Sequence, residues 1–336
     1  MERPEHMRVV ITGGEGFLGR RLTASLLRQG TLRAADGRSQ PIERITTVDV
    51  VPPSAPADPR LVAITGDIAD PALLRRAIGP DTTAVFHLAA VVSGMAEAEF
   101  DLGMRINLDA TRRLLDACRT GAARPRLVFT SSVAVYGPGA GALPETVLDT
   151  TAVAPTSSYG TQKAIAELLI GDYTRRGFVD GRILRLPTIS VRPGKPNAAA
   201  SSFASGIVRE PLNGQAANCP IDPDARLWLL SPATAIACLI AGHDIPAEAL
   251  GLNRIVNVPG VSTTAREMVA ALSRVAGAEV SQRVTWEPDP RIERIVATWP
   301  GAWDTTRARA LGFPADDSFD KIIRRYLAEE MGAAHT

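Results

Sequence analysis

The stretch Thr12-Gly13-Gly14-Glu15-Gly16-Phe17-Leu18-Gly19 follows the apolar run Val9-Val10-Ile11 and leads into Arg20-Arg21-Leu22-Thr23-Ala24-Ser25-Leu26-Leu27. This order predicts a buried strand, a glycine turn and a helix. Glycines let the backbone bend sharply and approach a pyrophosphate, and the helix N-terminus offers free N–H groups to the phosphates. A glycine fingerprint between a strand and a helix is typical of a dinucleotide site. We therefore expect cofactor contacts from Gly13, Gly16, Phe17, Leu18 and Gly19.

The next strand, Ile45 to Val50, places Asp49 at its carboxyl end. A carboxylate there can accept hydrogen bonds from the adenosine ribose hydroxyls. Val50, Val51 and Pro52 follow it, so no adjacent Arg or Lys would neutralise a ribose 2′-phosphate. These features favour NAD over NADP. The polar segment Thr31 to Glu43 predicts an inserted loop or short hairpin before this strand.

Strands and helices alternate along the following residues, which predicts a doubly wound parallel α/β sheet, the Rossmann architecture, with its site at the carboxyl ends of the strands. We expect Asp67 and Ile68 near the adenine, and the small residues at the end of the strand Ala84 to Ala90 to let the cofactor pass close by. Within that strand His87 is interpreted as a packed residue. The remaining cofactor candidates are Leu88, Ala89, Ala90, Asn107, Tyr159, Lys163, Pro187 and Thr188.

We expect residues 1–186 to form the cofactor-binding core. Residues 187–336 would form most of a smaller α/β substrate-binding region, with some segments returning to the core. The many prolines, glycines and asparagines from Pro187 to Pro223 predict loops that close over a substrate rather than core, apart from a short helix at Ser201 to Arg209.

Composition excludes several function classes. Of 336 residues, 45% are hydrophobic, and 37 Lys and Arg balance 36 Asp and Glu, so neither nucleic acid nor an anionic membrane is an expected partner. The three cysteines form no C-x-x-C pair and the four histidines do not cluster, so we expect no metal. Without an apolar signal core or a membrane-length run, the protein is expected in the cytoplasm.

Tyr159-Gly160-Thr161-Gln162-Lys163 places a tyrosine and a lysine four residues apart, on one face of a predicted helix. A free phenol has a pKa near ~10, and a neighbouring ammonium and an oxidised nicotinamide both favour the phenolate. Tyr159 is therefore the candidate base. Ser132, at the end of another predicted strand, is the candidate that orients the substrate hydroxyl, and Lys163 completes the catalytic set.

These residues together resemble the extended short-chain dehydrogenase/reductase superfamily, which contains the NAD-dependent epimerases and dehydratases. The resemblance covers most of the chain, and within it Ser132 rather than Ser131 matches the catalytic serine. It also implies a homodimer that pairs through the helices carrying Asn107 and Tyr159. The matching features are Gly13-x-x-Gly16-x-x-Gly19, Asp49, Asp67, Leu88-Ala89-Ala90, Asn107, Ser132 and Tyr159-x-x-x-Lys163.

The substrate half departs from the nucleotide-sugar enzymes of that superfamily, because Arg226-Leu227-Trp228-Leu229-Leu230 lacks their acidic positions. The insertion, Arg192-Pro193-Gly194 and Trp228 resemble bacterial sugar-acid dehydrogenases. That resemblance implies NAD-dependent oxidation of D-erythronate at C2 to 2-dehydro-D-erythronate.

A small sugar acid needs a cation for its carboxylate, and we expect that contact in the substrate half, where the candidates are Arg192, Lys195, Arg209 and Arg226. The substrate candidates are Ser93, Ser132, Tyr159, Arg192 and Arg226. The alternatives are a nucleotide-sugar epimerase or dehydratase, and a non-catalytic NAD-binding regulator.

Overall fold

A computed structural model describes residues 6–53, 58–120, 124–139 and 141–332, and its centre is an eight-stranded sheet. The strand order is β11-β7-β6-β5-β1-β3-β2, and β4 also pairs with β3. All of these pairs are parallel except β2 with β3. The strands are β1 (Met7–Thr12), β2 (Thr31–Arg33), β3 (Ser39–Asp49), β4 (Leu61–Thr65), β5 (Ala84–His87), β6 (Arg126–Ser132), β7 (Asp180–Leu186) and β11 (Ile255–Asn257).

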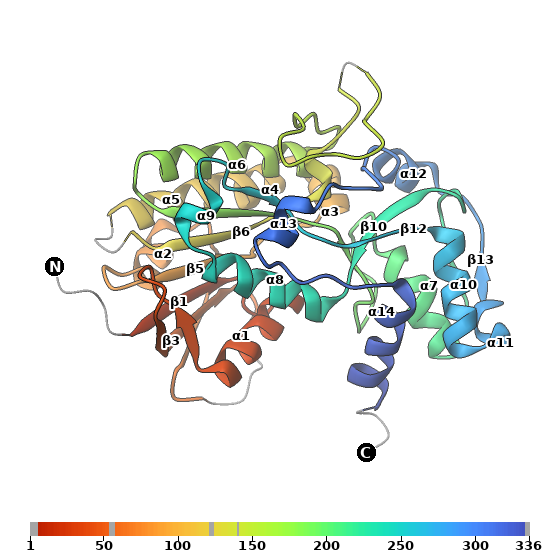
Figure 1. The fold of residues 1–336 in the computed structure, drawn as a ribbon, viewed down its shortest axis with the longest axis horizontal. Coiled ribbons are helices and arrows are strands. Elements are labelled where there is room, and N and C mark those ends of the chain that lie inside the picture. Colours follow the sequence, from red (N-terminus) through yellow and green to blue (C-terminus); the bar gives the residue numbers. More distant parts are fainter. Residues whose placement is uncertain (1–5, 54–57, 121–123, 140, 333–336) are drawn as a thin grey trace.

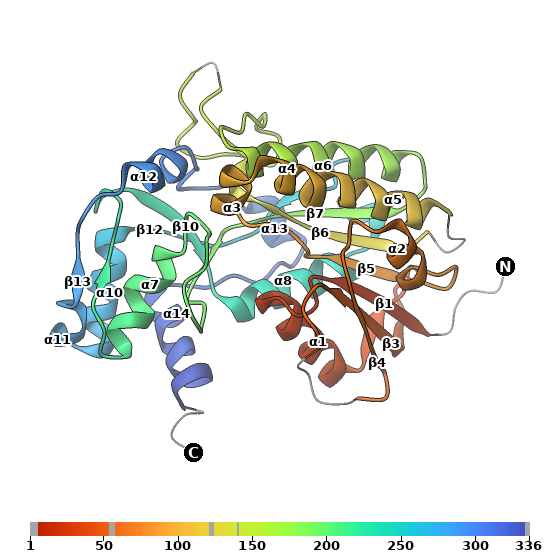
Figure 2. The same cartoon turned by 180° about the vertical axis from the view of Figure 1, so that it is seen from behind.

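Helices cover both faces of the sheet (Figures 1 and 2). One face packs against α1 (Phe17–Gln29) and α8 (Pro232–Asp244). The other packs against α2 (Pro71–Ala77), α5 (Ala110–Thr120) and α6 (Ser158–Arg175). Because the central strands are buried on both sides, they consist of almost continuous apolar runs. The expected doubly wound α/β sheet is confirmed.

The insertion is a hairpin. Strand β2 pairs antiparallel with the first residues of β3, from Thr31 opposite Pro41 to Arg33 opposite Ser39. The second part of β3 pairs in parallel with β4, from Ile45 opposite Leu61 to Asp49 opposite Thr65. One long strand therefore begins in the insertion and ends at Asp49.

The helix that carries Asn107 is long and irregular. It follows α3 (Ser93–Ala98) and comprises α4 (Phe100–Gly103), a π-helical segment (Met104–Asp109) and α5. π-helical turns often lie near functional sites. Asn107 lies in this segment.

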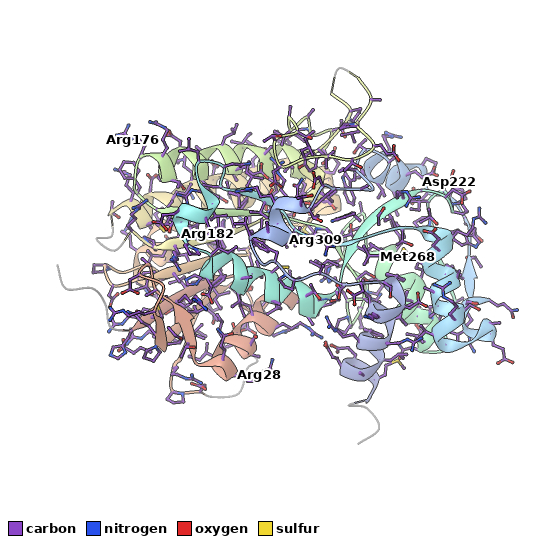
Figure 3. All side chains as sticks on the ribbon, in the orientation of Figure 1. Arg28, Arg176, Arg182, Asp222, Met268 and Arg309 are labelled. Carbon is purple, nitrogen blue, oxygen red and sulfur yellow. The ribbon has the colours of Figure 1, made fainter. Side chains whose placement is uncertain are left out.

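Segments after β7 build a second region with its own apolar core. Its sheet contains β8 (Thr188–Ile189), β10 (Arg226–Leu230) and β12 (Val261–Thr264), and α7 (Phe203–Leu212), α10 (Ala265–Ala276) and α14 (Phe319–Tyr326) pack together beside it. Met268 of α10 lies in this core (Figure 3). The smaller elements are β9 (Ala217–Asn218), β13 (Val284–Thr285), α9 (Ala247–Leu250), α11 (Ala278–Ser281), α12 (Pro290–Val296) and α13 (Thr306–Ala310).

The expectation that Pro187 to Pro223 avoids the core is wrong. Outside the helix expected at Ser201 to Arg209, the residues Val191, Cys219 and Ile221 are buried in the core of the second region, and so are Phe203 and Ile207 of α7. Prolines and glycines in this segment punctuate short elements, but the apolar residues between them still bury their side chains. Among the described residues, every helix is too short or too polar to cross a membrane.

Candidate active site

Two cavities meet at the glycine turn, beside the carboxyl ends of the central strands. The first, of about 320 Å³, is lined by Ser132, Tyr159 and Lys163, and we call it the catalytic cavity. The second, of about 410 Å³, is lined by Asp49 and Asp67, and we call it the acidic cavity. Both are also lined by Gly13, Gly16, Leu88 and Ala90. An elongated ligand can therefore lie across the turn with one end in each cavity.

The turn itself leaves room only for glycine. Gly13 has φ of +72°, and a Cβ on it would lie 2.8 Å from the backbone nitrogen of Ala89. A Cβ on Gly19 would lie 2.0 Å from the carbonyl oxygen of Gly13. Helix α1 starts after Gly16 without a side-chain cap among the described residues. Its first residues, Phe17, Leu18 and Gly19, line the catalytic cavity, so the N–H groups of the helix start are available to a pyrophosphate.

Asp49 is held in place by the backbone around it. The N–H of Glu15 donates to its Oδ2 at 3.0 Å, and the N–H of Val51 donates to its Oδ1 at 3.1 Å. Two carboxylate oxygens still have acceptor capacity for ribose hydroxyls. Arg105 also lines the acidic cavity and pairs with Asp67. It comes from the π-helical segment, so analysis of the residues next to Asp49 could not find it.

Asn107 does not line either cavity. Its side chain is buried, where Oδ1 accepts from the N–H of Val91 at 2.8 Å and Nδ2 donates to the Val91 carbonyl at 3.0 Å. Nδ2 also donates to Oε1 of Gln162 on α6 at 2.7 Å. Asn107 therefore positions the loop after β5, which does line both cavities. We expected Asn107 to contact the cofactor directly, but its side chain is buried and bonded to Val91 and Gln162 instead.

The three catalytic candidates lie together. The hydroxyls of Tyr159 and Ser132 share a hydrogen bond. The Lys163 Nζ donates to the carbonyl of Thr130 at 2.8 Å and lies 5.6 Å from the centre of the Tyr159 ring. Strand β6 and helix α6 thus supply the two sides of one polar cluster.

Burial dominates the titration of this cluster. It raises the pKa of Tyr159 to about 12, while the hydrogen bond from Ser132 acts in the opposite direction. Burial likewise lowers the pKa of Lys163 to about 7, and the charge of Glu167 opposes that change. We expected Lys163 to make the phenol more acidic, but burial raises the pKa of Tyr159, and the opposing influence comes from the Ser132 hydroxyl. A further positive charge, such as an oxidised nicotinamide, is needed to favour the phenolate.

Glu167 organises a buried network that our sequence analysis missed. Its carboxylate accepts from Ser131 Oγ at 2.5 Å and from the Arg185 guanidinium at 2.9 and 2.6 Å. These bonds tie α6 to β6 and β7. The spacing of four residues from Lys163 was a signal that could have indicated it, because it places both residues on one face of α6.

The structure separates the two arginines proposed for the substrate. Arg192 lines the catalytic cavity, with its Cζ 5.3 Å from the centre of the Phe17 ring. Its buried Nε has no hydrogen-bond partner among the described residues. Arg226 instead starts β10 as an exposed residue and donates to Ser262 Oγ at 3.3 Å, outside the catalytic cavity.

The remaining candidate residues also differ in the cavity that they line. Lys195 and Arg209 line a small pocket next to Arg192, and Arg209 is already engaged by the Arg192 carbonyl and by Glu210. Ser93, Pro187 and Thr188 line the catalytic cavity, and Ile68 and Ala89 line the acidic one. His87 is packed as expected, between the hydroxyls of Thr12 and Thr111. The described residues contain no group of three or more His, Cys, Asp or Glu that could hold a metal ion.

Among the residues that line the catalytic cavity, Trp299 lies furthest along the chain. It follows α12, and Ala199 and Ser201 approach the cavity from the segment before α7. No local pattern in the sequence marks these residues.

The glycine cradle, the fixed Asp49 and the catalytic cluster fit a nicotinamide dinucleotide. Residues 9–226 match the NAD dependent epimerase/dehydratase family. The chain belongs to this family, and its cofactor is NAD.

Two relatives are similar along their whole length. The chain is 62% identical to the D-erythronate dehydrogenase of Cupriavidus necator, over 98% of this chain and 100% of that protein. It is 46% identical to the D-erythronate dehydrogenase of Haemophilus influenzae, over 97% of this chain and 100% of that protein.

A solved structure from Agrobacterium tumefaciens, described as a nucleoside-diphosphate-sugar epimerase, is also similar. Its TM-score is 0.90 and its identity is 43%, over 98% of this chain and 96% of that chain.

Proposed function

We propose that this protein oxidises D-erythronate at C2 with NAD, giving 2-dehydro-D-erythronate. The observation that carries the proposal is 62% identity along the full length of a D-erythronate dehydrogenase. The small catalytic cavity, which is lined by Arg192 as well as by Ser132 and Tyr159, suits a short hydroxy acid.

Tyr159 is the proposed base. Its phenolate takes the proton of the C2 hydroxyl while the C2 hydrogen leaves with its electron pair, so that the C–O single bond becomes a carbonyl. NAD bound across the glycine turn supplies the hydride acceptor. Ser132 donates a hydrogen bond to the same substrate oxygen and so directs it toward Tyr159.

Lys163 has two proposed tasks. Its ammonium stabilises the phenolate, and it can hydrogen-bond a ribose hydroxyl of the cofactor. The Thr130 carbonyl, 2.8 Å from Nζ, holds the side chain in place for both.

Arg192 is the proposed partner of the substrate carboxylate. A guanidinium can bind a carboxylate through two parallel hydrogen bonds, and its Nε is buried without a partner among the described residues. Arg226 is no longer proposed for this role because it lies outside the catalytic cavity.

A nucleotide-sugar epimerase is the second candidate, and the description of the Agrobacterium tumefaciens structure favours it. The two functions differ in their products, because an epimerase returns the hydride to its substrate. We would measure NADH at 340 nm with D-erythronate and, separately, with UDP-sugars. Net NADH from D-erythronate alone is the expected result, and epimerised UDP-sugar without NADH would contradict the proposal.

We further propose that the protein works as a homodimer in the cytoplasm. Leu168 of α6 is 71% exposed and Phe100 of α4 is 58% exposed, on the helices that the resemblance assigns to pairing. The three cysteines are buried free thiols, which suits a reducing compartment.

A further inference from the structure

A third cavity lies directly beside the catalytic cavity. It has a volume of about 1060 Å³, and we call it the wide cavity. Its lining comes from α3, α7 and α12, including Ala98, Gly206 and Ile295. Ala199 lines both this cavity and the catalytic one. A single stretch of backbone therefore separates a small reactive space from a much larger one.

That stretch, residues 197–200, is a turn closed by its own hydrogen bonds, and we call it the dividing turn. The N–H of Ala199 donates to Asn197 Oδ1 at 3.2 Å. Ser202 closes the turn from the other side, because its N–H donates to the Ala199 carbonyl at 2.9 Å and its Oγ accepts from the N–H of Asn197 at 3.3 Å. The turn is therefore a defined element of the wall.

The dividing turn is also fastened to α3. The N–H of Ala200 donates to Ser93 Oγ at 3.1 Å. Gly94, which follows Ser93 in α3, lets the backbone of α3 contact the backbone of the dividing turn. A Cβ at this position would lie 2.2 Å from the Ala198 carbonyl oxygen. Any larger residue at position 94 must push the turn away from α3. The contact between Gly94 and Ala198 thus closes the wall between the two cavities.

The catalytic cavity has little room to spare. Its 320 Å³ must receive the nicotinamide end of the cofactor and the acid together. Trp299 and Ile189 also line it. A sugar acid with further carbons would find free volume in the wide cavity, but only by displacing the dividing turn.

We propose that the dividing turn, held against α3 at Ser93 and Gly94, sets the maximum chain length of the sugar acid that this protein oxidises. This inference rests on the proposed function. It assigns the specificity for chain length to the dividing turn between the two cavities rather than to a contact with the reacting carbon. Residues 197–200 do not touch the reacting atoms in this proposal. They exclude longer acids because the displaced turn would lose its hydrogen bonds to Ser93 and Ser202.

The test compares kcat/KM for three acids with the same configuration at C2 and C3: D-erythronate, D-ribonate with one more carbon, and D-allonate with two. We expect the wild type to prefer D-erythronate over D-ribonate by at least about tenfold, the scale on which pockets reject one added group. A wild type that oxidises D-ribonate or D-allonate as well as D-erythronate would overturn the proposal.

Gly94→Ala should raise kcat/KM for D-ribonate relative to D-erythronate by about tenfold or more. Alanine is favourable in a helix, so the change acts through the clash with Ala198 rather than through helix propensity. Ser202→Ala removes the Oγ that holds Asn197 without adding bulk, and should shift the ratio the same way by a smaller factor. It decides the matter if Gly94→Ala does not fold.

Gly171→Ala is the matched control, because it adds the same methyl group to a helical glycine of α6 where a Cβ would meet nothing within 4 Å, and it should leave the ratio unchanged. Suppose that the Gly94→Ala and Ser202→Ala proteins fold and keep the wild-type ratio of kcat/KM for D-ribonate and D-erythronate. That result would overturn the proposal that the dividing turn limits chain length. A wild type that is inactive with D-erythronate would overturn the proposed function instead. The wall would then be tested with two successive chain lengths of the acid that the wild type does oxidise.

Discussion

Tyr159 experiences opposing influences on its acidity. Burial raises its pKa to about 12, and the hydrogen bond from Ser132 acts against burial. A base with a raised pKa is deprotonated only when positive charge is close, so its function depends on Lys163 and the bound cofactor.

Tyr159→Phe should therefore keep the ring packing and remove the base. We expect NAD affinity, measured by fluorescence titration, to stay near the wild-type value. We expect kcat to fall by about 10²–10⁴-fold, the usual contribution of a positioned acid–base group. A variant with near-normal turnover would show that another group accepts the proton.

The pH dependence gives an independent measure of the same residue. Because the deprotonated phenol is the active form, kcat/KM should rise with pH through an ionisation on the alkaline side of neutrality. Burial lowers the pKa of Lys163 to about 7, and a neighbouring phenolate in turn favours its ammonium form. Lys163→Met removes this mutual stabilisation, so the rise in kcat/KM should move to higher pH. His87 supplies the contrast, because burial lowers its pKa to about 3 and leaves it neutral throughout this range.

Arg192 is the residue that we expect to bind the substrate carboxylate. Arg192→Ala should raise KM for D-erythronate far more than KM for a matching polyol that lacks the carboxylate. Arg226→Ala is the control, since that exposed side chain lies outside the catalytic cavity. Equal losses on acid and polyol in steady-state kinetics would remove Arg192 from this role.

Three elements depend on one buried carboxylate. Glu167 of α6 binds Ser131 of β6 and Arg185 of β7, and the side chains of Glu167 and Arg185 are only 4% and 2% exposed. Arg185 also donates to the Tyr136 hydroxyl at 2.7 Å. These bonds join α6, which carries Tyr159, to β6, which carries Ser132.

Glu167→Gln should destabilise the protein strongly, because it leaves the Arg185 guanidinium buried without a counter-charge. Loss of one partner of a buried pair costs about 3–5 kcal/mol of the free energy of unfolding. Urea denaturation measures this change. Asp224→Asn breaks the exposed pair with Arg266 and should hardly move the unfolding midpoint. Similar midpoints for both variants would contradict a structural role of the Glu167 network.

At the scale of the whole molecule, the homodimer makes a separate prediction. Leu168→Glu places a charge on the proposed pairing helix, and the mass measured by light scattering should fall from dimer to monomer. Leu252→Glu is the control, because Leu252 is fully exposed on the loop after α9. A wild-type protein that is monomeric at micromolar concentration would disprove the dimer.

The local parts of the site were predictable because their geometry depends on neighbours in the chain. Gly13 must adopt positive φ wherever a strand turns so tightly into a helix, and residues four apart share a helix face in any fold. Thus the cofactor turn, the carboxylate of Asp49 and the pairing of Tyr159 with Lys163 followed from the sequence alone.

Contacts between distant segments were decided only by the tertiary structure. The sequence made Arg192 and Arg226 equally suitable candidates for the substrate carboxylate, yet of the two only Arg192 lines the catalytic cavity. Likewise Arg105 reaches the acidic cavity from the π-helical segment, and Trp299 reaches the catalytic cavity from beyond α12. Such positions depend on how the second region packs against the sheet, through many weak long-range contacts that leave no local pattern in the chain.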